Sequence, residues 1–316
     1  YINNVLGFMN SKVAEYYLEA ISPGMSTVSG DLEKLPYYIN YQEKENVNLI
    51  VENSVQIAKY DWDYFEISWD FSAHPLVSLK SKGNSVINYS NAQYRIKDIY
   101  KDWEYQTGQD FIKLKANEEK LNQIFIDLYG LQDELTSEVE DKYITVRKAD
   151  LQVDIKSLLS YAVGCMFGRY SIDVDGLAYA GGDWNDSKYT TFIPDKDNCI
   201  LITDEEYFED DIVGQFVEFV KCVYGVETLE ENLDFIARAL GNKGDTSREI
   251  IRNYFVKDFY KDHVKTYQKR PIYWLYDSGK QDGFKALVYM HRYTADTTGI
   301  VRVDYLHKMQ KIYMSE

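Results

Sequence analysis

Basic residues recur near the end of this sequence at a spacing that suits contacts with phosphate groups. Lys257, Lys261 and Lys265 are four residues apart, which on an α-helix places three ammonium groups on one face. Residues 242–316 hold fourteen basic and nine acidic side chains, a net charge of +5, whereas residues 1–241 hold 21 basic and 42 acidic ones. Such asymmetry indicates that one end of the chain faces a polyanion, for which double-stranded DNA is the candidate partner. The candidate contact residues are Lys257, Lys261, Lys265, Lys269, Arg270, Lys280, Lys285, Arg292 and Arg302.

Ion pairs within a helix are the alternative interpretation of the same run. Asp258 and Asp262 lie among the lysines, and pairs formed on the helix would neutralise their charge. Arg270 and Arg292 could instead be buried partners of the many acidic residues. The residue pattern leaves both interpretations open.

No arrangement of residues in this sequence predicts catalysis. Methyl transfer to the amino group of a flipped base uses an Asn/Asp-Pro-Pro-Tyr/Phe loop, and the five prolines here are never adjacent. The methyl donor requires a glycine-rich turn after a strand, and no two glycines stand two positions apart. A magnesium-dependent nuclease would need an Asp/Glu-x-Lys motif after Pro194 and Asp195, which is missing. We therefore predict no catalytic residue, no cofactor-binding residue and no metal site in this chain.

Cysteine usage and hydropathy indicate the compartment. Cys165, Cys199 and Cys222 are odd in number and far apart, which argues against a disulfide framework and a zinc knuckle and favours a reducing cytoplasm. No apolar run approaches the roughly 18–20 residues that span a bilayer, so we expect no membrane association. The chain starts at Tyr1 without a signal peptide and directly inside a helical pattern, which predicts a piece of a longer polypeptide.

Helix signals dominate the elements that must position these residues. Thr203, Thr228 and Thr246 each precede a glutamate by three positions, which predicts three capping boxes. Gly225 and Gly241 are expected to end the first two of these helices. At the start of the chain, apolar side chains fall on one helical face at Leu6, Met9, Val13, Tyr17 and Ile21.

Longer patterns complete the expected architecture. A helix is expected over 150–168, and residues 91–129 predict a helical pair or one helix interrupted at Gly108. Aromatic and β-branched residues at 272–276 and 284–289 predict a β-hairpin. The expected fold class is α+β, predominantly helical, with one or more small antiparallel β elements.

Four segments of the sequence resemble the PglX family, the methyltransferases of BREX and phage-growth-limitation defence systems. The segments are 61–76 (DWDYFEISWDFSAHPL), 128–135 (LYGLQDEL), 154–173 (DIKSLLSYAVGCMFGRYSID) and 269–293 (KRPIYWLYDSGKQDGFKALVYMHRY). Residues 6–24 followed by 30–36 look like the closing helix and strand of a target-recognition domain, a pairing shared by type I and type IIG methylation subunits. The resemblance covers nearly the whole chain.

This resemblance implies that the intact protein is an adenine-N6 DNA methyltransferase that uses S-adenosylmethionine. Its catalytic domain would lie before Tyr1, and the family pattern assigns no catalytic residue to the part present here. The implied domains are the end of the target-recognition domain with a connecting helix (1–60), a connector with a long helical segment (61–150), and a C-terminal helical domain with a hairpin near 272–289 (151–316).

Two functions from different classes fit this context. The first is a DNA-positioning module, which the basic end motivates. The second is a docking module for other defence components or phage inhibitors, which the acidic residues 1–241 motivate. An aromatic run could stack nucleic-acid bases, but its acidic neighbours favour a connector packed in the core. The run comprises Trp62, Tyr64, Phe65, Trp69 and Phe71.

Overall fold

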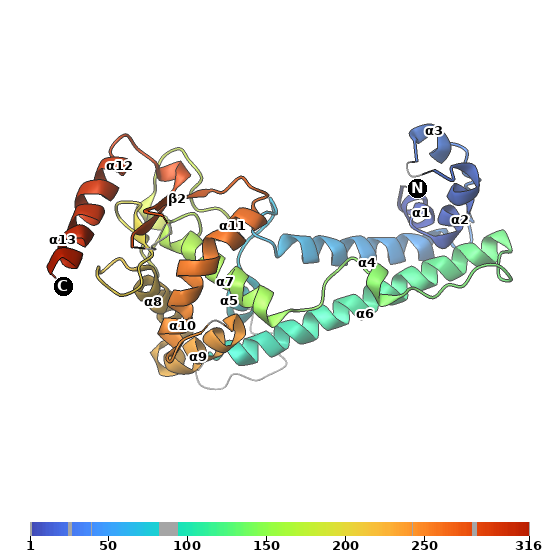
Figure 1. Ribbon diagram of the computed structural model, residues 1–316. Helices are drawn as coiled ribbons and strands as arrows, with labels where there is room; N and C mark the ends of the chain where they lie inside the picture. Colours follow the sequence, from blue (N-terminus) through green and yellow to red (C-terminus); the bar gives the residue numbers. More distant parts are fainter. Residues whose placement is uncertain are drawn as a thin grey trace. The chain divides into compact units, whose positions relative to one another are not determined.

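The chain forms two compact units in the computed structural model (Figure 1), which describes residues 2–24, 27–38, 40–81, 94–241, 243–279 and 283–315. Unit 1 comprises Tyr1–Trp62 and Tyr105–Ala149, and unit 2 comprises Asp63–Glu104 and Asp150–Glu316. Helices predominate and one small antiparallel sheet is present, which confirms the α+β class. The three-part division drawn from the sequence stays a prediction. Within the described ranges, no helix combines the length and apolar character needed to cross a bilayer.

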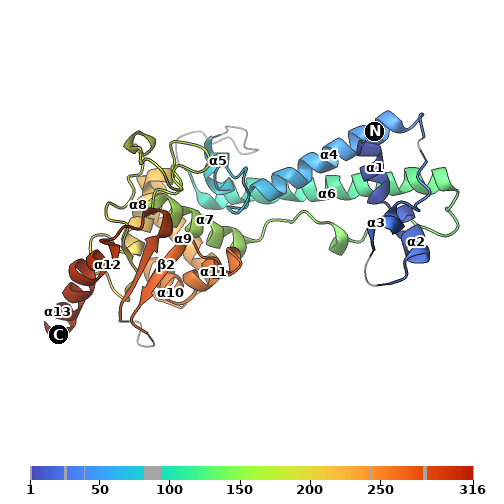
Figure 2. The same cartoon turned by 90° about the horizontal axis from the view of Figure 1, so that it is seen from above.

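Unit 1 is built on two helices that run side by side (Figures 1 and 2). Val47 and Val51 of α4 (Lys44–Asp63) share a buried cluster with Leu121 and Phe125 of α6 (Ile96–Tyr129). Phe8 and Val13 join this cluster from α1 (Ile2–Met9) and α2 (Lys12–Ile21). Short helices α3 (Ser29–Leu32) and η1 (Asp141–Tyr143) complete the unit.

The single helical face expected over residues 6–21 was wrong, because the chain turns between α1 and α2. Ser11 caps the second helix, its side chain accepting from the Ala14 amide, and the Ser11 hydroxyl donates to the Phe8 carbonyl at 2.7 Å. A serine that satisfies backbone groups in this way competes with helix continuation. Leu6 is consequently exposed while Val13 is fully buried.

Helix α6 is continuous over 34 residues, so the interruption expected at Gly108 was wrong. A glycine inside a helix costs about 1 kcal/mol relative to alanine, which buried packing on either side can offset. Trp103 lies before it in unit 2, and Phe111 and Leu114 after it in unit 1 are both buried. Residues 91–93 of the expected segment lie outside the described residues.

Unit 2 surrounds helix α7 (Leu151–Met166), which confirms the helix expected at 150–168. The Asp150 side chain caps it by accepting from the Val153 amide at 3.0 Å. Helices α8 (Ile212–Tyr224) and α9 (Leu229–Leu240) pack against it, and α10 (Ser247–Tyr254) packs against α8 and α9. The remaining helical elements are α5 (Pro75–Ser81), η2 (Asp186–Lys188), η3 (Val226–Thr228), η4 (Phe255–Phe259), α11 (Tyr260–Thr266), η5 (Met290–Arg292), α12 (Thr297–Ile300), η6 (Val301–Leu306) and α13 (His307–Ser315).

The sheet contains the expected hairpin and a short third strand. Strands β2 (Tyr273–Asp277) and β3 (Lys285–Tyr289) pair antiparallel, with Leu275 opposite Leu287. The third strand, β1 (Ile200–Leu201), pairs with the other edge of β3 and was not predicted from the sequence. Two residues are too few to show an alternating pattern, so only the partner strand identifies this element.

Of the three expected capping boxes, the structure places a threonine cap only at Thr246, whose side chain accepts from the Glu249 amide at 3.2 Å. Thr203 lies well before α8, and Asp211 caps that helix instead. Thr228 occupies a helix start, but its hydroxyl donates to the Tyr94 carbonyl at 3.0 Å. Gly225 and Gly241 end their helices as expected, with φ of 94° and 70°.

The aromatic run at 62–71 is only partly packed in the core. The expectation that the whole run packs in the core was therefore wrong for Trp62 and Trp69, which are exposed. Within unit 2, Tyr64 meets Trp103 edge-on at 4.6 Å between ring centroids, and Phe71 is buried. Trp69, in contrast, is 98% exposed. In unit 1, Trp62 is 54% exposed.

Candidate phosphate-binding surface

The lysine run begins in helical structure but does not continue as one helical face. Lys257 lies in η4, a π-helical segment, and Lys261 and Lys265 lie in α11, which ends at Thr266. The wider π-helical turn changes the angle between successive side chains, so four-residue spacing no longer keeps them in line. Lys269 and Arg270 follow the helix. All five basic residues of this run are exposed.

The acidic residues among these lysines neutralise only part of their charge. Asp258 lies 3.6 Å from the Lys261 ammonium group, whose side chain is 78% exposed. Asp262 instead pairs at 2.9 Å with Lys156 of helix α7. Exposed pairs of this kind contribute little free energy, so they do not prevent the lysines from meeting another anion.

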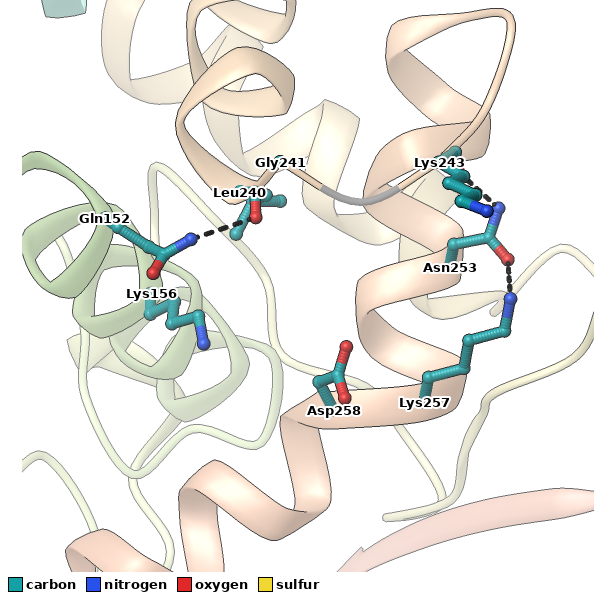
Figure 3. Close-up of a pocket in the computed structure, with 8 residues that line it drawn as sticks. All are labelled: Gln152, Lys156, Leu240, Gly241, Lys243, Asn253, Lys257 and Asp258. Atoms are coloured by element: carbon teal, nitrogen blue, oxygen red, sulfur yellow. Dashed lines mark hydrogen bonds between the residues drawn. The ribbon is translucent and has the colours of Figure 1, made fainter.

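A polar pocket of about 520 Å³ brings three lysines together beside this run (Figure 3). Lys156 comes from α7, Lys257 from η4, and Lys243 from the segment that follows α9. Asn253 holds two of them: its side-chain amide donates to the Lys243 carbonyl at 2.8 Å, and its oxygen accepts from Lys257 at 3.0 Å. Asp258 is the acidic residue of the lining. The pocket therefore carries a positive charge suited to an anion.

Sequence reasoning missed Lys156 and Lys243 as members of this group. Lys156 lies in the acidic first part of the chain, and no local pattern relates it to Lys257. Packing of α7 beside the later helices brings it there. Lys243 belongs to the basic region 242–316, and that charge excess was the signal that could have included it.

Two of the expected contact residues donate to backbone groups inside the fold. Lys285 donates to the Val256 carbonyl at 2.9 Å. Arg292 donates to the carbonyls of Phe167 and Asp195, and its guanidinium lies 4.6 Å from the centre of the Trp184 ring. Arg302 in η6 is exposed, and Lys280 lies outside the described residues.

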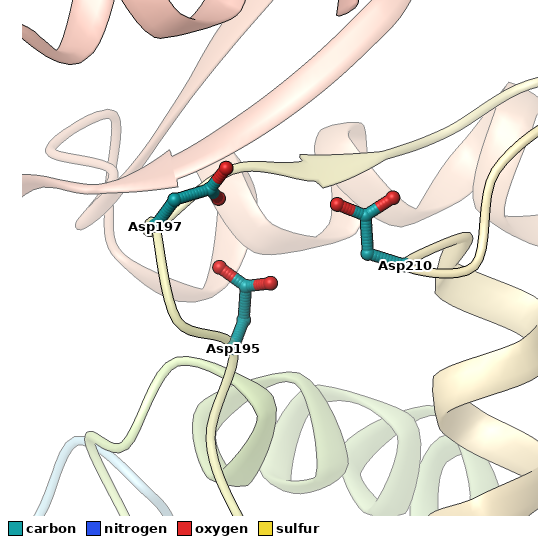
Figure 4. Close-up of side chains that lie close together, drawn as sticks. All are labelled: Asp195, Asp197 and Asp210. Carbon is teal, nitrogen blue, oxygen red and sulfur yellow. The ribbon is translucent and has the colours of Figure 1, made fainter. Parts of the chain in front are cut away.

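Three aspartates of unit 2 form a separate acidic cluster (Figure 4). One oxygen from each of Asp195, Asp197 and Asp210 lies within 4.8 Å of the others, close enough for one cation. Protein donors already engage these groups: the Cys199 amide donates to Asp195 and Asp197 at 3.1 and 3.0 Å, and the Tyr305 hydroxyl lies 2.7 Å from Asp197. Burial, followed by the charge of Asp197, raises the pKa of Asp195 to about 7.

Asp195→Asn is expected to stabilise the protein at pH 8 by about 2 kcal/mol, with little effect near pH 4. Because the folded-state pKa of Asp195 is raised, the folded protein binds an extra proton between about pH 4 and 7, and stability falls as pH rises through that window. An asparagine keeps an oxygen for the Cys199 amide. Urea denaturation of both proteins from pH 4 to 8 measures the difference, and a difference that does not change with pH would contradict this assignment.

The chain is similar in sequence to two curated bacterial proteins. It is 48% identical over 311 residues to the adenine-specific methyltransferase PglX of Lacticaseibacillus casei (strain Zhang), and 34% identical over 336 residues to the adenine-specific methyltransferase BrxX of Escherichia coli O9:H4 (strain HS). These alignments cover 98% and 96% of this chain, but 25% and 26% of the relatives. No protein-family model matches the chain.

The resemblance to PglX expected from four sequence segments is thus confirmed over nearly the whole chain. The chain is similar to PglX and BrxX and spans about a quarter of the length of these curated relatives.

Proposed function

We propose that this chain is the non-catalytic, DNA-positioning part of an adenine-N6 DNA methyltransferase of a bacterial phage-defence system. The similarity to PglX and BrxX supports the class of the parent protein. In this proposal the parent binds S-adenosylmethionine through residues outside this chain and works in the cytoplasm. The present residues contribute affinity for the duplex.

The observation that carries the DNA role is the pocket lined by Lys156, Lys243 and Lys257, together with the exposed basic residues that follow it along the chain. We refer to these residues together as the basic surface; the residues after the pocket are Lys261, Lys265, Lys269 and Arg270. A duplex offers a regular array of phosphates, and each lysine that contacts one releases bound counterions. The three-lysine pocket would hold one phosphate, and the exposed lysines that follow would meet its neighbours. Such contacts position a duplex without reading its sequence.

Neutralising three exposed lysines is expected to weaken duplex binding by at least about tenfold at low salt. The variant carries Lys261→Gln, Lys265→Gln and Lys269→Gln, all at exposed positions. The slope of log affinity against log salt should fall in magnitude by about 2–3, because three phosphate contacts are lost. Fluorescence anisotropy with a labelled duplex at several salt concentrations measures both quantities.

A matched control removes the same charge elsewhere. Lys97, Lys113 and Lys120 are exposed on α6 and lie outside the basic surface. Their triple substitution by glutamine should leave most of the affinity and the salt slope in place. The proposal would be contradicted by equal losses of duplex affinity in the two triple variants. It would also be contradicted if the unmodified chain did not bind the duplex, or bound it with an affinity independent of salt.

A docking role for other defence proteins or phage inhibitors is the second candidate. Exposed aromatic side chains favour it, since Trp69 and Tyr41 are 98% and 79% exposed and large aromatics concentrate at protein interfaces. Residues 1–241 also carry a net charge of −21, from 21 basic and 42 acidic residues, which would repel DNA. Stoichiometric capture of a purified defence component, with no shift of a labelled duplex, would favour docking over DNA positioning.

A further inference from the structure

Unit 2 contains a second pocket, of about 530 Å³, with an aromatic wall and two charged residues. Its lining residues come from the aromatic run at 62–71, from the turn after α7 and from the end of α11. Phe71 and Tyr170 in this lining are buried, whereas Trp69 is 98% exposed. An indole left almost wholly in water beside a pocket is placed to stack on a planar ligand.

Glu66 in this pocket has an unused hydrogen-bonding oxygen. Its Oε1 accepts from the Ser160 hydroxyl at 2.7 Å. Its Oε2 is buried and has no hydrogen-bond partner within the described part of the chain. Burial raises the pKa of this carboxyl group, which the Ser160 hydrogen bond and the charge of Arg169 oppose. A carboxylate can accept through both oxygens at once, so Oε2 is available to a ligand donor while Oε1 keeps its bond to Ser160.

Arg169 is the second charged residue of the lining, and it does not satisfy Glu66. Its Nε donates to the Tyr170 hydroxyl at 3.1 Å, and its Nη1 donates to the Tyr289 hydroxyl at 3.3 Å. The guanidinium also lies over the Tyr170 and Tyr267 rings, at 5.2 and 6.0 Å from their centres. In the described residues its Nη2 has no acceptor, so the two charged residues that line the pocket each keep a hydrogen-bonding atom without a protein partner.

We propose that this pocket binds a nucleobase-like planar heterocycle through a ring N–H beside a carbonyl oxygen. The N–H donates to Glu66, the carbonyl oxygen accepts from Arg169, and Trp69 stacks on the ring. Guanine, thymine and uracil present this edge. The volume of about 530 Å³ accommodates a nucleoside. This pocket is independent of the pocket in the basic surface, because the two pockets are lined by different residues.

Binding is tested with guanosine and thymidine as free ligands and a short thymine oligodeoxynucleotide as the strand-borne source. We expect saturable quenching of Trp69 fluorescence with a dissociation constant of about 100 µM. A response to the nucleosides identifies a free ligand, and a response to the oligonucleotide alone identifies an unpaired base in a strand. 1-Methylguanosine keeps the ring but lacks the N–H, and it should bind about tenfold more weakly.

Two variants test whether ligand binding takes place in this pocket. Glu66→Gln replaces the carboxylate with a group of the same shape and should weaken binding about tenfold. Its melting temperature should stay the same or rise, because an unsatisfied buried charge is removed, whereas a purely structural Glu66 would give a fall. Trp69→Ala changes a fully exposed side chain and should abolish stacking without affecting the fold.

Trp62→Ala is the matched control for the tryptophan change, since Trp62 is exposed and does not line the pocket. It should leave the nucleoside affinity unchanged when binding is followed by calorimetry. The proposal is overturned if none of the three probes binds up to about 1 mM, which is a very weak affinity. It is also overturned if 1-methylguanosine binds as well as guanosine, or if Glu66→Gln and Trp69→Ala both leave binding intact.

Discussion

Replacing Asp211 by alanine is expected to lower the free energy of unfolding by about 3–5 kcal/mol. Asp211 is fully buried, and its carboxylate forms a two-point pair with Arg252 at 2.7 and 2.8 Å. The same carboxylate caps helix α8 by accepting from the Val213 and Gly214 amides at 3.0 and 3.3 Å. The substitution leaves an uncompensated guanidinium in the interior and removes the helix cap.

Urea denaturation of the purified chain measures this loss, and a second two-point pair provides the control. Arg248 and Glu230 meet at 2.8 and 2.7 Å, but the side chains of both are exposed, by 46% and 69%. Glu230→Ala should cost less than about 1 kcal/mol, since water screens an exposed pair. Similar losses in the two variants would mean that burial does not determine the contribution of Asp211.

Gly164→Ala is expected to destabilise unit 2 by about 2–3 kcal/mol. An added Cβ at Gly164 would lie 2.3 Å from Cδ2 and 2.8 Å from Cε2 of Tyr170. Both residues are buried, and the Tyr170 ring stacks on that of Tyr161 at 5.2 Å, so the ring can move away from the added Cβ only by giving up this packing. Thermal denaturation followed by circular dichroism measures the effect.

The same substitution at Gly108 should act in the opposite direction. Gly108 lies in the interior of helix α6, and an added Cβ there meets no atom within 4 Å. Alanine should therefore stabilise the chain by about 0.5–1 kcal/mol through its higher helix propensity. If both variants shift the melting temperature in the same direction, the close contact of Gly164 with Tyr170 is not what determines stability there.

The substitution at Gly164 should also affect the proposed nucleobase pocket, because Tyr170 lines that pocket. A displaced Tyr170 ring would move the hydroxyl that accepts from Arg169 at 3.1 Å. Gly164→Ala is therefore expected to lower the affinity for nucleosides as well as the stability of unit 2. The carboxylate of Glu66, left with an unused oxygen in the interior, is the kind of locally unfavourable feature that functional sites retain.

Local signals within a few neighbouring residues were enough to predict several elements of the fold. Asp150 marks the start of α7, and Gly225 marks the end of α8. The β2–β3 hairpin was evident from its two aromatic arms. Capping hydrogen bonds, left-handed glycines and alternating patterns act over short stretches of chain, so they can be read without knowing the fold. The four family-like segments were likewise a property of the sequence.

Which of several plausible partners each side chain takes depends on contacts between distant parts of the chain. Thr203 and Asp211 could each start a helix, and burial beside Arg252 selects Asp211. Likewise, the gathering of Lys156 with Lys257, and the placement of Glu66 beside Arg169, depend on packing between elements that are distant in sequence. The charge and the hydrogen-bonding capacity of each side chain follow directly from its residue type. Whether they point to solvent, to a backbone carbonyl or into a pocket is determined by long-range packing, which no local pattern encodes.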